Sequence, residues 1–325
     1  MNPFIDAPGC YDIPVGTYHS DPVVTPSLSS GMAKTILEQS PRHAWLNSRR
    51  LNPAFEPEHR TLFDLGHAAH AVILGAGEEI AIIDAPNYTT KAAQQAKQLA
   101  YLEGRTPVLK HQMASVNEMA AAVRAQLDRH EEASEAFVPG LGKAEQALIW
   151  QEPNGVWCRA LLDWKPNGGN VFHDLKSTGA SANPDLWGSR TLYDGGFDVQ
   201  AAFYCRGIRA VLKIDDPHFR FCVVENEPPY ALSVVELTPA AMAMANRKAE
   251  EAIAIFGWCQ RNNRWPGYPG RVCYVDPPAW AERKWLEREE RGRLVNEAGE
   301  SLLKIAVDWQ APLPRIEPPK DEEAA

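Results

Sequence analysis

The chain alternates between segments with helical spacing of apolar residues and short runs of apolar, β-branched and aromatic residues. Helical spacing predicts helices over residues 31–50 (with a break near Ser40-Pro41), 62–74, two segments between 90 and 130, 197–212 and 239–259. The apolar runs predict strands over residues 144–151, 156–164, 170–175, 219–225 and 230–237. The stretch from Asn183-Pro184 to Gly195-Gly196 is predicted as a loop. This mixture of elements predicts an α/β fold.

Chain organisation follows from composition along the sequence. Residues 1–27 are rich in Pro, Asp and Gly and predict an irregular arm. Residues 28–305 are predicted to form a single domain, because polar residues of interest interleave with core segments throughout it. Residues 306–325 are rich in Pro and acidic residues, which predicts a flexible tail.

Two neighbouring predicted strands, 156–164 and 170–175, are joined by Pro166-Asn167-Gly168-Gly169, which is strong turn chemistry. A two-residue turn at Gly168-Gly169 pairs Asn167 with Asn170 and, counting outward, Asp163 with Asp174. Directly opposed residues have Cβ atoms about 5 Å apart. Strand alternation then puts Lys176 on the face of Asp174 and turns Leu175 toward the opposite, buried face.

Two carboxylates and an ammonium at this spacing can bind a divalent metal and an attacking water. The carbonyl of Leu175 could add a hard oxygen ligand. Asp163 by itself would more often be an ordinary strand-end residue, and Asp174-Leu175-Lys176 could be a solvated edge with a salt bridge. Their combination in one hairpin register favours a metal site that cuts phosphodiesters.

Three more polar residues lie on predicted helices. His70 shares a helix face with Gly66 and Leu74, although a core histidine bonded to a carbonyl is a serious alternative. His67 and His70 lack the H-E-x-x-H pattern of zinc peptidases. Gln200 and Tyr204 are four residues apart on the helix 197–212 and could simply be polar positions on a packed helix.

Composition narrows the class of protein. At 325 residues and 45% hydrophobic content the chain can bury a large core, and no apolar run is long enough to span a bilayer, so we expect a cytoplasmic protein without membrane contact. The six cysteines form no C-x-x-C pair, so neither a zinc ribbon nor a compact iron–sulfur cluster is indicated.

The formal charge of −9 counts against a surface coated in basic residues, although a local basic groove could still bind DNA. Candidates for such a groove are Arg42, Arg49, Arg50, Arg60, Lys143, Arg159 and Arg190. The late tryptophans could stack on bases, although packing is the default expectation; they are Trp258, Trp265, Trp280 and Trp285.

Four motifs follow one another along the chain: Leu65-Gly66-His67-Ala68-Ala69-His70, Cys158-Arg159-Ala160-Leu161-Leu162-Asp163-Trp164, Asp174-Leu175-Lys176-Ser177-Thr178 and Gln200-Ala201-Ala202-Phe203-Tyr204. In this order they resemble the PD-(D/E)xK nuclease superfamily, and within it the nuclease domain of RecE-type exonucleases (exodeoxyribonuclease VIII). Tyr18-His19, Leu28-Ser29-Ser30 and Ser40-Pro41 are similar to the family's opening, so the resemblance covers about residues 16–260. It implies a restriction-endonuclease-like core, a mixed central sheet flanked by helices, with an N-terminal helical elaboration.

The resemblance also implies roles for individual residues. Metal ligands for Mg²⁺ or Mn²⁺ would be His70, Asp163, Asp174 and the Leu175 carbonyl. Lys176 would orient the attacking water and counter charge on the phosphate, while Gln200 and Tyr204 match the downstream helix motif. Glu145 matches a glutamate near the site and ranks lower. Leu161 stands where some relatives carry a basic residue, which bears on local DNA contacts.

The function implied is a metal-dependent exonuclease that digests one strand of a duplex from its end, in the 5′ to 3′ direction, and leaves a 3′ single strand for recombination. The resemblance implies as partners double-stranded DNA ends, a single-strand annealing recombinase and further copies of the chain in a homo-oligomeric ring, in a phage or prophage module. The alternatives are an endonuclease or structure-specific nuclease of the same fold, and a catalytically silent DNA-binding or assembly module.

Overall fold

A computed structural model describes residues 4–56 and 64–297, and its chain divides into two compact units, residues 1–268 and 269–325. The division falls inside the range 28–305 that the sequence predicts as a single domain. The second unit contains α11 (Ala279–Glu297). The tail predicted at 306–325 lies outside the described residues. Within the described ranges, no helix combines the length and apolar character needed to cross a bilayer.

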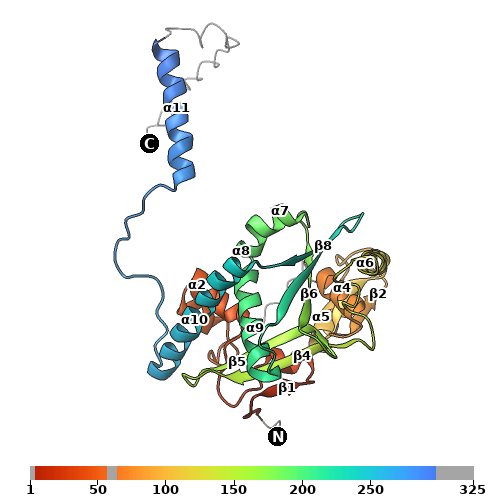
Figure 1. Cartoon of the computed structure of the whole chain (residues 1–325). Coiled ribbons are helices and arrows are strands. Elements are labelled where there is room, and N and C mark those ends of the chain that lie inside the picture. Colours follow the sequence, from red (N-terminus) through yellow and green to blue (C-terminus); the bar gives the residue numbers. More distant parts are fainter. Residues whose placement is uncertain (1–3, 57–63, 298–325) are drawn as a thin grey trace, which may run out of the picture. The chain divides into compact units, whose positions relative to one another are not determined.

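A mixed six-stranded sheet forms the centre of the first unit, with the strand order β1-β4-β5-β6-β7-β8 (Figure 1). Only β6 and β7 are parallel neighbours; the other adjacent pairs are antiparallel. The strands are β1 (Gly9–Tyr11), β4 (Gly142–Gln151), β5 (Trp157–Pro166), β6 (Val171–Thr178), β7 (His218–Glu225) and β8 (Leu232–Glu236). The mixed α/β fold class predicted from the sequence is confirmed.

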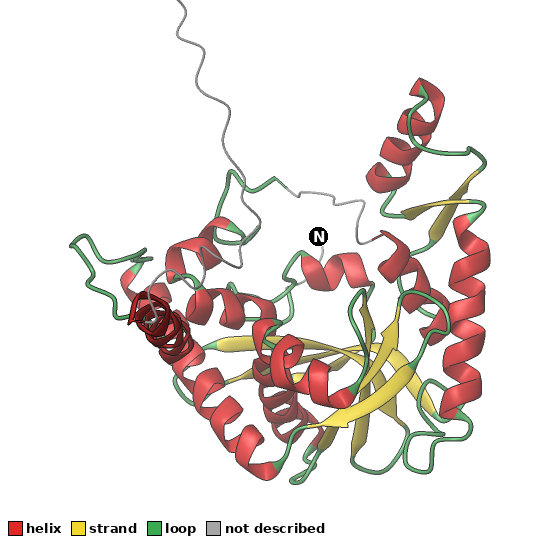
Figure 2. Cartoon of the chain, turned by 90° about the horizontal axis from the view of Figure 1, so that it is seen from above, coloured by secondary structure: helices red, strands yellow, loops and turns green. Residues whose placement is uncertain are grey.

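Helices pack on both faces of this sheet (Figure 2). On one face lie α2 (Ser30–Glu38), α9 (Phe197–Leu212) and α10 (Pro239–Asn262), and on the other α4 (Asp64–Leu74) and α6 (Gln112–Leu127). Successive side chains of β7 point to opposite faces of the sheet. Phe221 and Val223 therefore pack with α2, α9 and α10, and Cys222 and Val224 pack with α4 and α6. The catalytic candidates on β5 and β6 are thereby enclosed between two apolar layers.

Most predicted elements occur close to their expected positions, and the helix predicted over 197–212 matches α9 at both ends. The break predicted near Ser40-Pro41 is observed and divides the segment 31–50 into α2 and α3 (Pro41–Leu46), the second of which ends before residue 50. The Ser40 hydroxyl caps α3 by accepting a hydrogen bond from the His43 N–H at 3.4 Å. The two helices predicted between 90 and 130 are α5 (Lys91–Leu102) and α6.

Two short strands were not predicted from the sequence. β2 (Ile80–Ile83) and β3 (Thr106–Leu109) form a separate two-stranded parallel sheet. Four-residue strands, one with a Pro at its second position, give too little alternation to be distinguished from loops.

The loop predicted before Gly195-Gly196 is wrong, because residues 184–194 are helical throughout. They form α7 (Pro184–Leu186), a π-helical turn (Trp187–Thr191) and α8 (Leu192–Asp194). The Asn183 side chain accepts from the N–H of Asp185 at 2.9 Å and starts the segment, and burial of Trp187 holds it on the core.

The arm predicted as irregular over residues 1–27 contains β1, paired with β4, and the five-residue α1 (Val15–His19). Both are local structures that depend on contact with the sheet: Tyr18 packs with Ala147 and Leu161. The many Pro and Gly residues of this segment are typical of loops, so the sequence pattern does not predict β1 or α1.

Candidate active site

The predicted hairpin register is confirmed. Trp164 of β5 pairs with His173 of β6, so one step outward Asp163 lies opposite Asp174. Within residues 4–56 and 64–297 this is the one ladder pair between the two strands. Where the ladder stops, Asp163 Oδ2 accepts a hydrogen bond from the backbone N–H of Leu175 at 2.8 Å. The carboxylate of Asp163 thus replaces a backbone acceptor and is fixed between the strands.

Glu145 faces the same point from β4. Ala144 pairs with Trp164 and Gln146 with Leu162, which leaves Glu145 opposite Asp163 outside the regular pairing. Its backbone is left-handed, with φ of 54°, a conformation that costs a non-glycine residue about 1 kcal/mol or more. Its Oε2 is buried and has no hydrogen-bond partner among the described residues. A strained backbone and an unpartnered carboxylate oxygen are features typical of functional sites.

His70 joins the cluster from α4. Its Nε2 lies 2.9 Å from Asp163 Oδ2 and its Nδ1 lies 3.5 Å from Glu145 Oε1. Gly66, one turn earlier on α4, faces β6, where a Cβ added to it would lie 3.2 Å from the Ser177 Oγ. The alternative of a core histidine bonded to a carbonyl is therefore not what the structure shows.

Asp174 is held from two sides. The ammonium of Lys176 contacts Asp174 Oδ2, and Gln200 of α9 donates from Nε2 to Asp174 Oδ1 at 2.7 Å. Leu175 points to the opposite face and packs in the core beneath α4 and α6, as strand alternation predicts. Gln200 orients this carboxylate, and the salt bridge of Lys176 is built into the cluster and does not lie on a solvated edge.

Tyr204, one turn after Gln200, lies in the apolar core. Its ring meets that of Phe219 edge-on with centroids 5.3 Å apart, and burial raises the pKa of its phenol well above the ordinary value. In the described part of the chain no hydrogen bond joins Tyr204 to the acidic residues. The structure therefore brings together seven of the eight candidates and places Tyr204 behind them.

Charges within the cluster shift its pKa values strongly. Burial works to lower the pKa of His70, but the carboxylates of Asp163 and Glu145 outweigh it and raise that pKa to about 9. Burial would raise the pKa of Asp163, yet His70 holds it below its ordinary value. Burial and the charge of Asp163 raise the pKa of Glu145 to about 7, and the same two causes raise the pKa of Asp174. The site contains more carboxylate than its own cations neutralise.

Access to the cluster runs past two side chains. His70 is 28% exposed and Lys176 20%, whereas Asp163, Glu145 and Asp174 are 12%, 11% and 1% exposed. A substrate would therefore meet the imidazole and the ammonium first, with the carboxylates behind them.

A divalent metal fits the chemistry of this donor set. No three His, Cys, Asp or Glu side chains in the described ranges already stand in a ligating arrangement. The reason is that the side chains bind one another: Asp163 is engaged by His70, and Asp174 by Lys176. The unpartnered Oε2 of Glu145 and the excess of carboxylate over cation are the observations that favour a bound cation.

Two aromatic rings near Lys176 were missed by the sequence reasoning. The Lys176 ammonium lies 5.2 Å from the ring centroid of Phe197 and 5.8 Å from that of Phe221. The only sequence signal was Gly195-Gly196 directly before Phe197.

Several predicted DNA contacts have other roles in the structure. Arg159 is buried, donates to Ser27 and lies 3.3 Å from Asp21, and Arg190 pairs with Asp194. Arg60 lies outside the described residues. Arg42, Arg49 and Lys143 are exposed, and Arg50 is partly buried with its guanidinium over the Phe4 ring. Among the tryptophans, Trp265 packs on Phe256, whereas the exposed ones are Trp258, Trp280 and Trp285.

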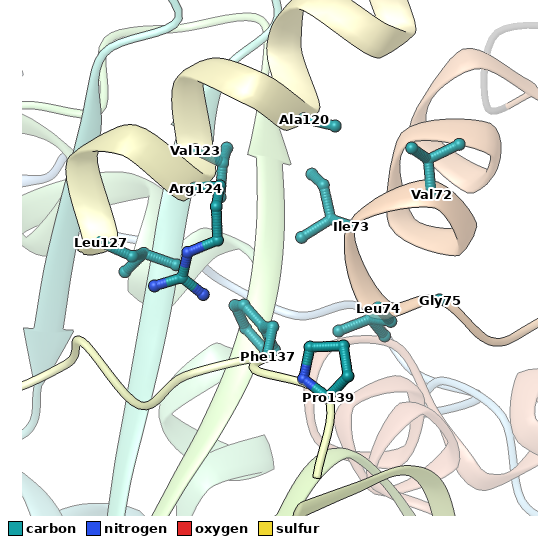
Figure 3. Close-up of a pocket in the computed structure, with 10 residues that line it drawn as sticks. All are labelled: Val72, Ile73, Leu74, Gly75, Ala120, Val123, Arg124, Leu127, Phe137 and Pro139. Atoms are coloured by element: carbon teal, nitrogen blue, oxygen red, sulfur yellow. The ribbon is translucent and has the colours of Figure 1, made fainter. Parts of the chain in front are cut away.

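A separate apolar pocket of about 250 Å³ lies between α4 and α6 (Figure 3). Its one charged side chain, Arg124, is already bound by Asp128 and by the carbonyls of Ser134 and Ala136. None of the eight candidate residues lines it, so we place the chemistry at the carboxylate cluster.

Comparison with known proteins gives one family. Residues 29–278 match the family described as "PDDEXK-like domain of unknown function (DUF3799)". No curated protein matches the chain.

Two solved structures match the chain over much of its length. A "Putative exonuclease" from Eubacterium rectale is 14% identical with a TM-score of 0.49, covering 82% of this chain and 97% of its own. The protein SSO0001 is 12% identical with a TM-score of 0.26, covering 69% of this chain and 85% of its own. At these values neither likeness supports a functional conclusion.

Proposed function

Because the chain belongs to the PDDEXK-like family DUF3799, we propose that it is a metal-dependent DNA exonuclease whose site is built on Asp163, Asp174 and Lys176. The observation that carries this proposal is the convergence of these residues with His70 and Glu145 around one partly accessible point. A pure DNA-binding module has no need of buried carboxylates in excess of their cations.

The metal would be held by Asp163, Asp174 and the Leu175 carbonyl, with His70 and Glu145 at its side. When bound there, Mg²⁺ or Mn²⁺ supplies Lewis-acid stabilisation of the phosphate charge and lowers the pKa of water. His70 and the N–H of Leu175 fix the Asp163 carboxylate. Gln200 fixes that of Asp174 in the same way. The ligands are thus oriented before a metal arrives.

Lys176 acts directly on the reacting groups in this proposal. Burial would lower its pKa, but Asp174 and Asp163 raise it, so the side chain stays charged at neutral pH. A charged ammonium orients the attacking water and stabilises the charge that develops on the phosphate oxygens. It serves as an electrostatic group and not as a general base.

Attack from duplex ends, 5′ to 3′ polarity and a recombination role come from the resemblance to RecE-type exonucleases. The same resemblance supports a single-strand annealing protein as partner and a ring of several copies around DNA. A ring would let the exposed Arg42, Arg49 and Lys143 of each copy contribute to one channel despite the net charge of −9. An endonuclease of the same fold is the second candidate, because the site chemistry is common to both.

The proposal is tested with end-labelled linear duplex and covalently closed circular duplex, each with Mg²⁺ or EDTA. We expect the wild type to degrade only the linear DNA and only with Mg²⁺. Lys176→Ala should lose at least about 100-fold in rate, the scale of one electrostatic group in an active site.

Lys110→Ala is the matched control, since Lys110 also pairs with an aspartate, Asp84 at 3.0 Å, but on the exposed surface. It should retain full activity. Cutting of the closed circle would favour the endonuclease, and absence of turnover with any divalent metal would favour the binding module.

A further inference from the structure

The ammonium of Lys176 is surrounded by a carboxylate and two aromatic rings. Asp174 contacts it directly, and the ring centroids of Phe197 and Phe221 lie 5.2 Å and 5.8 Å away. Both distances are within the roughly 6 Å over which an aromatic face attracts a cation. The two rings also contact each other, tilted by 50° with centroids 5.9 Å apart, so both belong to one aromatic group beside the ammonium.

The position of Phe197 is built by the segment that precedes it. Gly196 has φ of +66°, and a Cβ at Gly195 would lie 2.5 Å from the Phe197 ring, so both positions require glycine. Trp187, in the π-helical turn, stacks on Phe197 with centroids 5.5 Å apart and planes 8° apart. π-Helical turns are rare in proteins, but those that do occur are often found at functional sites. The whole segment 187–197 thereby fixes the plane of one ring.

Phe197 differs from an ordinary core residue in its exposure. Phe221 is fully buried, whereas Phe197 is only partly buried, and the Lys176 side chain next to it is 20% exposed. A ring beside a partly exposed ammonium covers part of that ammonium from water. Low exposure to water increases the strength of a cation–π contact.

Ring faces have a chemical advantage as partners for this lysine. An ammonium has three N–H donors, and a carboxylate or carbonyl on each side would occupy them. An aromatic face attracts the charge without fixing a donor to one acceptor. Donors not used by Asp174 then remain available to water and phosphate.

We propose that Phe197, supported by Trp187 and Phe221, is a positioning residue that holds the Lys176 ammonium by cation–π attraction. This proposal rests on the proposed nuclease function for its consequence, because Lys176 is the electrostatic group of that reaction. The rings themselves touch no substrate.

Ring fluorination separates cation–π attraction from packing. Phenylalanine analogues with one, two and three ring fluorines at position 197 keep the shape of the side chain but progressively weaken the negative face of the ring. We expect kcat on linear duplex to fall stepwise, to about tenfold below wild type for the trifluoro ring, with KM little changed. Phe197→Leu should lose at least as much.

The same series at Phe172 is the control. Phe172 is fully buried in the same apolar cluster but has no ammonium over its ring among the described contacts. Fluorination there should leave kcat unchanged. If fluorination at position 197 leaves kcat unchanged, the ring contributes packing alone, and the proposal is overturned.

A second readout does not depend on nuclease activity. In protein with ¹³C-labelled lysine, the ε-methylene protons of Lys176 lie near two ring faces, and their assigned resonance should lie upfield of that of the exposed Lys110 in EDTA. Phe197→Leu should move the Lys176 resonance toward that of Lys110 while the remaining spectrum stays dispersed. An unshifted resonance in the wild type would refute the ring contact, whereas a shifted one in a protein without turnover would refute only the nuclease function.

Discussion

At the residue scale, Glu145 has two features that are unfavourable for the metal-free fold. Glu145 combines a left-handed backbone with a buried carboxylate whose Oε2 has no partner in the described part of the chain. Its pKa is raised to about 7 by burial and by the charge of Asp163. At neutral and higher pH the ionised carboxylate is therefore less favourable in the folded state than in the unfolded state, where it is solvated and has its ordinary pKa.

Glu145→Gln should stabilise the metal-free protein at high pH. A carboxyl whose folded pKa lies above its unfolded value destabilises the fold increasingly as pH rises from about 4.5 through about 7. Urea unfolding in EDTA should show the variant about 1–3 kcal/mol more stable than wild type at pH 8 and nearly equal at pH 4.5. Glu38→Gln, on an exposed i,i+4 pair with Lys34, should show no such pH dependence. A Glu145→Gln protein less stable than wild type at pH 8 contradicts this reading.

The His70 and Asp163 pair has the opposite dependence on pH. The raised pKa of His70 means that the pair's contribution is fully present below about 6.5 and is lost as pH rises through about 9. An NMR titration of the imidazole in EDTA should therefore give a midpoint near 9. His70→Gln should cost about 2 kcal/mol at pH 6 and much less at pH 10. An ordinary midpoint near 6.5 would show that the ion pair does not form.

At the element scale, the site depends on how closely two helices approach the sheet. α4 brings His70 to Asp163, and α9 brings Gln200 to Asp174. Each helix has a glycine where it contacts the sheet: Gly66 in α4 and Gly207 in α9. Gly66 faces the exposed hydroxyl of Ser177, whereas Gly207 faces the ring of the buried Trp150.

Alanine should have opposite effects at the two glycines. At Gly66 the added Cβ would lie 3.2 Å from a hydroxyl that can rotate, so Gly66→Ala should gain about 0.5–1 kcal/mol from helix propensity. At Gly207 it would lie 2.7 Å from the Trp150 ring, so Gly207→Ala should lose about 1–3 kcal/mol. Thermal unfolding of both variants measures this. Equal effects at the two positions would mean that the close approach of α9 is not as described.

The same elements show what could be predicted from the sequence. Gly168-Gly169 set the register of β5 and β6, so the pairing of Asp163 with Asp174 followed from local turn chemistry. The boundaries of α9 followed from spacing alone. The sequence did not predict β2, β3 or the helical segment 184–194. These elements are held by tertiary contacts, which leave no periodic pattern in the sequence.

Some features of the site could not be predicted from the sequence either, because they too depend on tertiary contacts. The left-handed Glu145 and the bond from Leu175 N–H to Asp163 depend on where three strands meet, which no single segment encodes. Phe197 was missed because a single aromatic residue at a helix start has no distinguishing pattern in sequence.

At the scale of the whole molecule, the candidate site lies within the first compact unit. All eight predicted site residues fall between positions 70 and 204, inside residues 1–268. The second unit contributes none of them.

A chain ending after Tyr268 should therefore fold cooperatively and keep the site. We expect a single unfolding transition for residues 1–268 and the same His70 titration as in the full chain. Its rate on short duplexes should match that of the full chain. A truncated protein that is folded but has lost the high His70 pKa would show that residues 269–325 help to build the site.

Anomalous scattering from crystals soaked in Mn²⁺ shows whether Asp163 and Asp174 hold a metal together. We expect a peak about 2.0–2.3 Å from carboxylate oxygens of both residues, with His70 or Glu145 alongside, and no peak there in crystals of Asp174→Asn. Absence of a peak between these aspartates in the wild type, with Mn²⁺ bound elsewhere or nowhere, would contradict the proposed metal site.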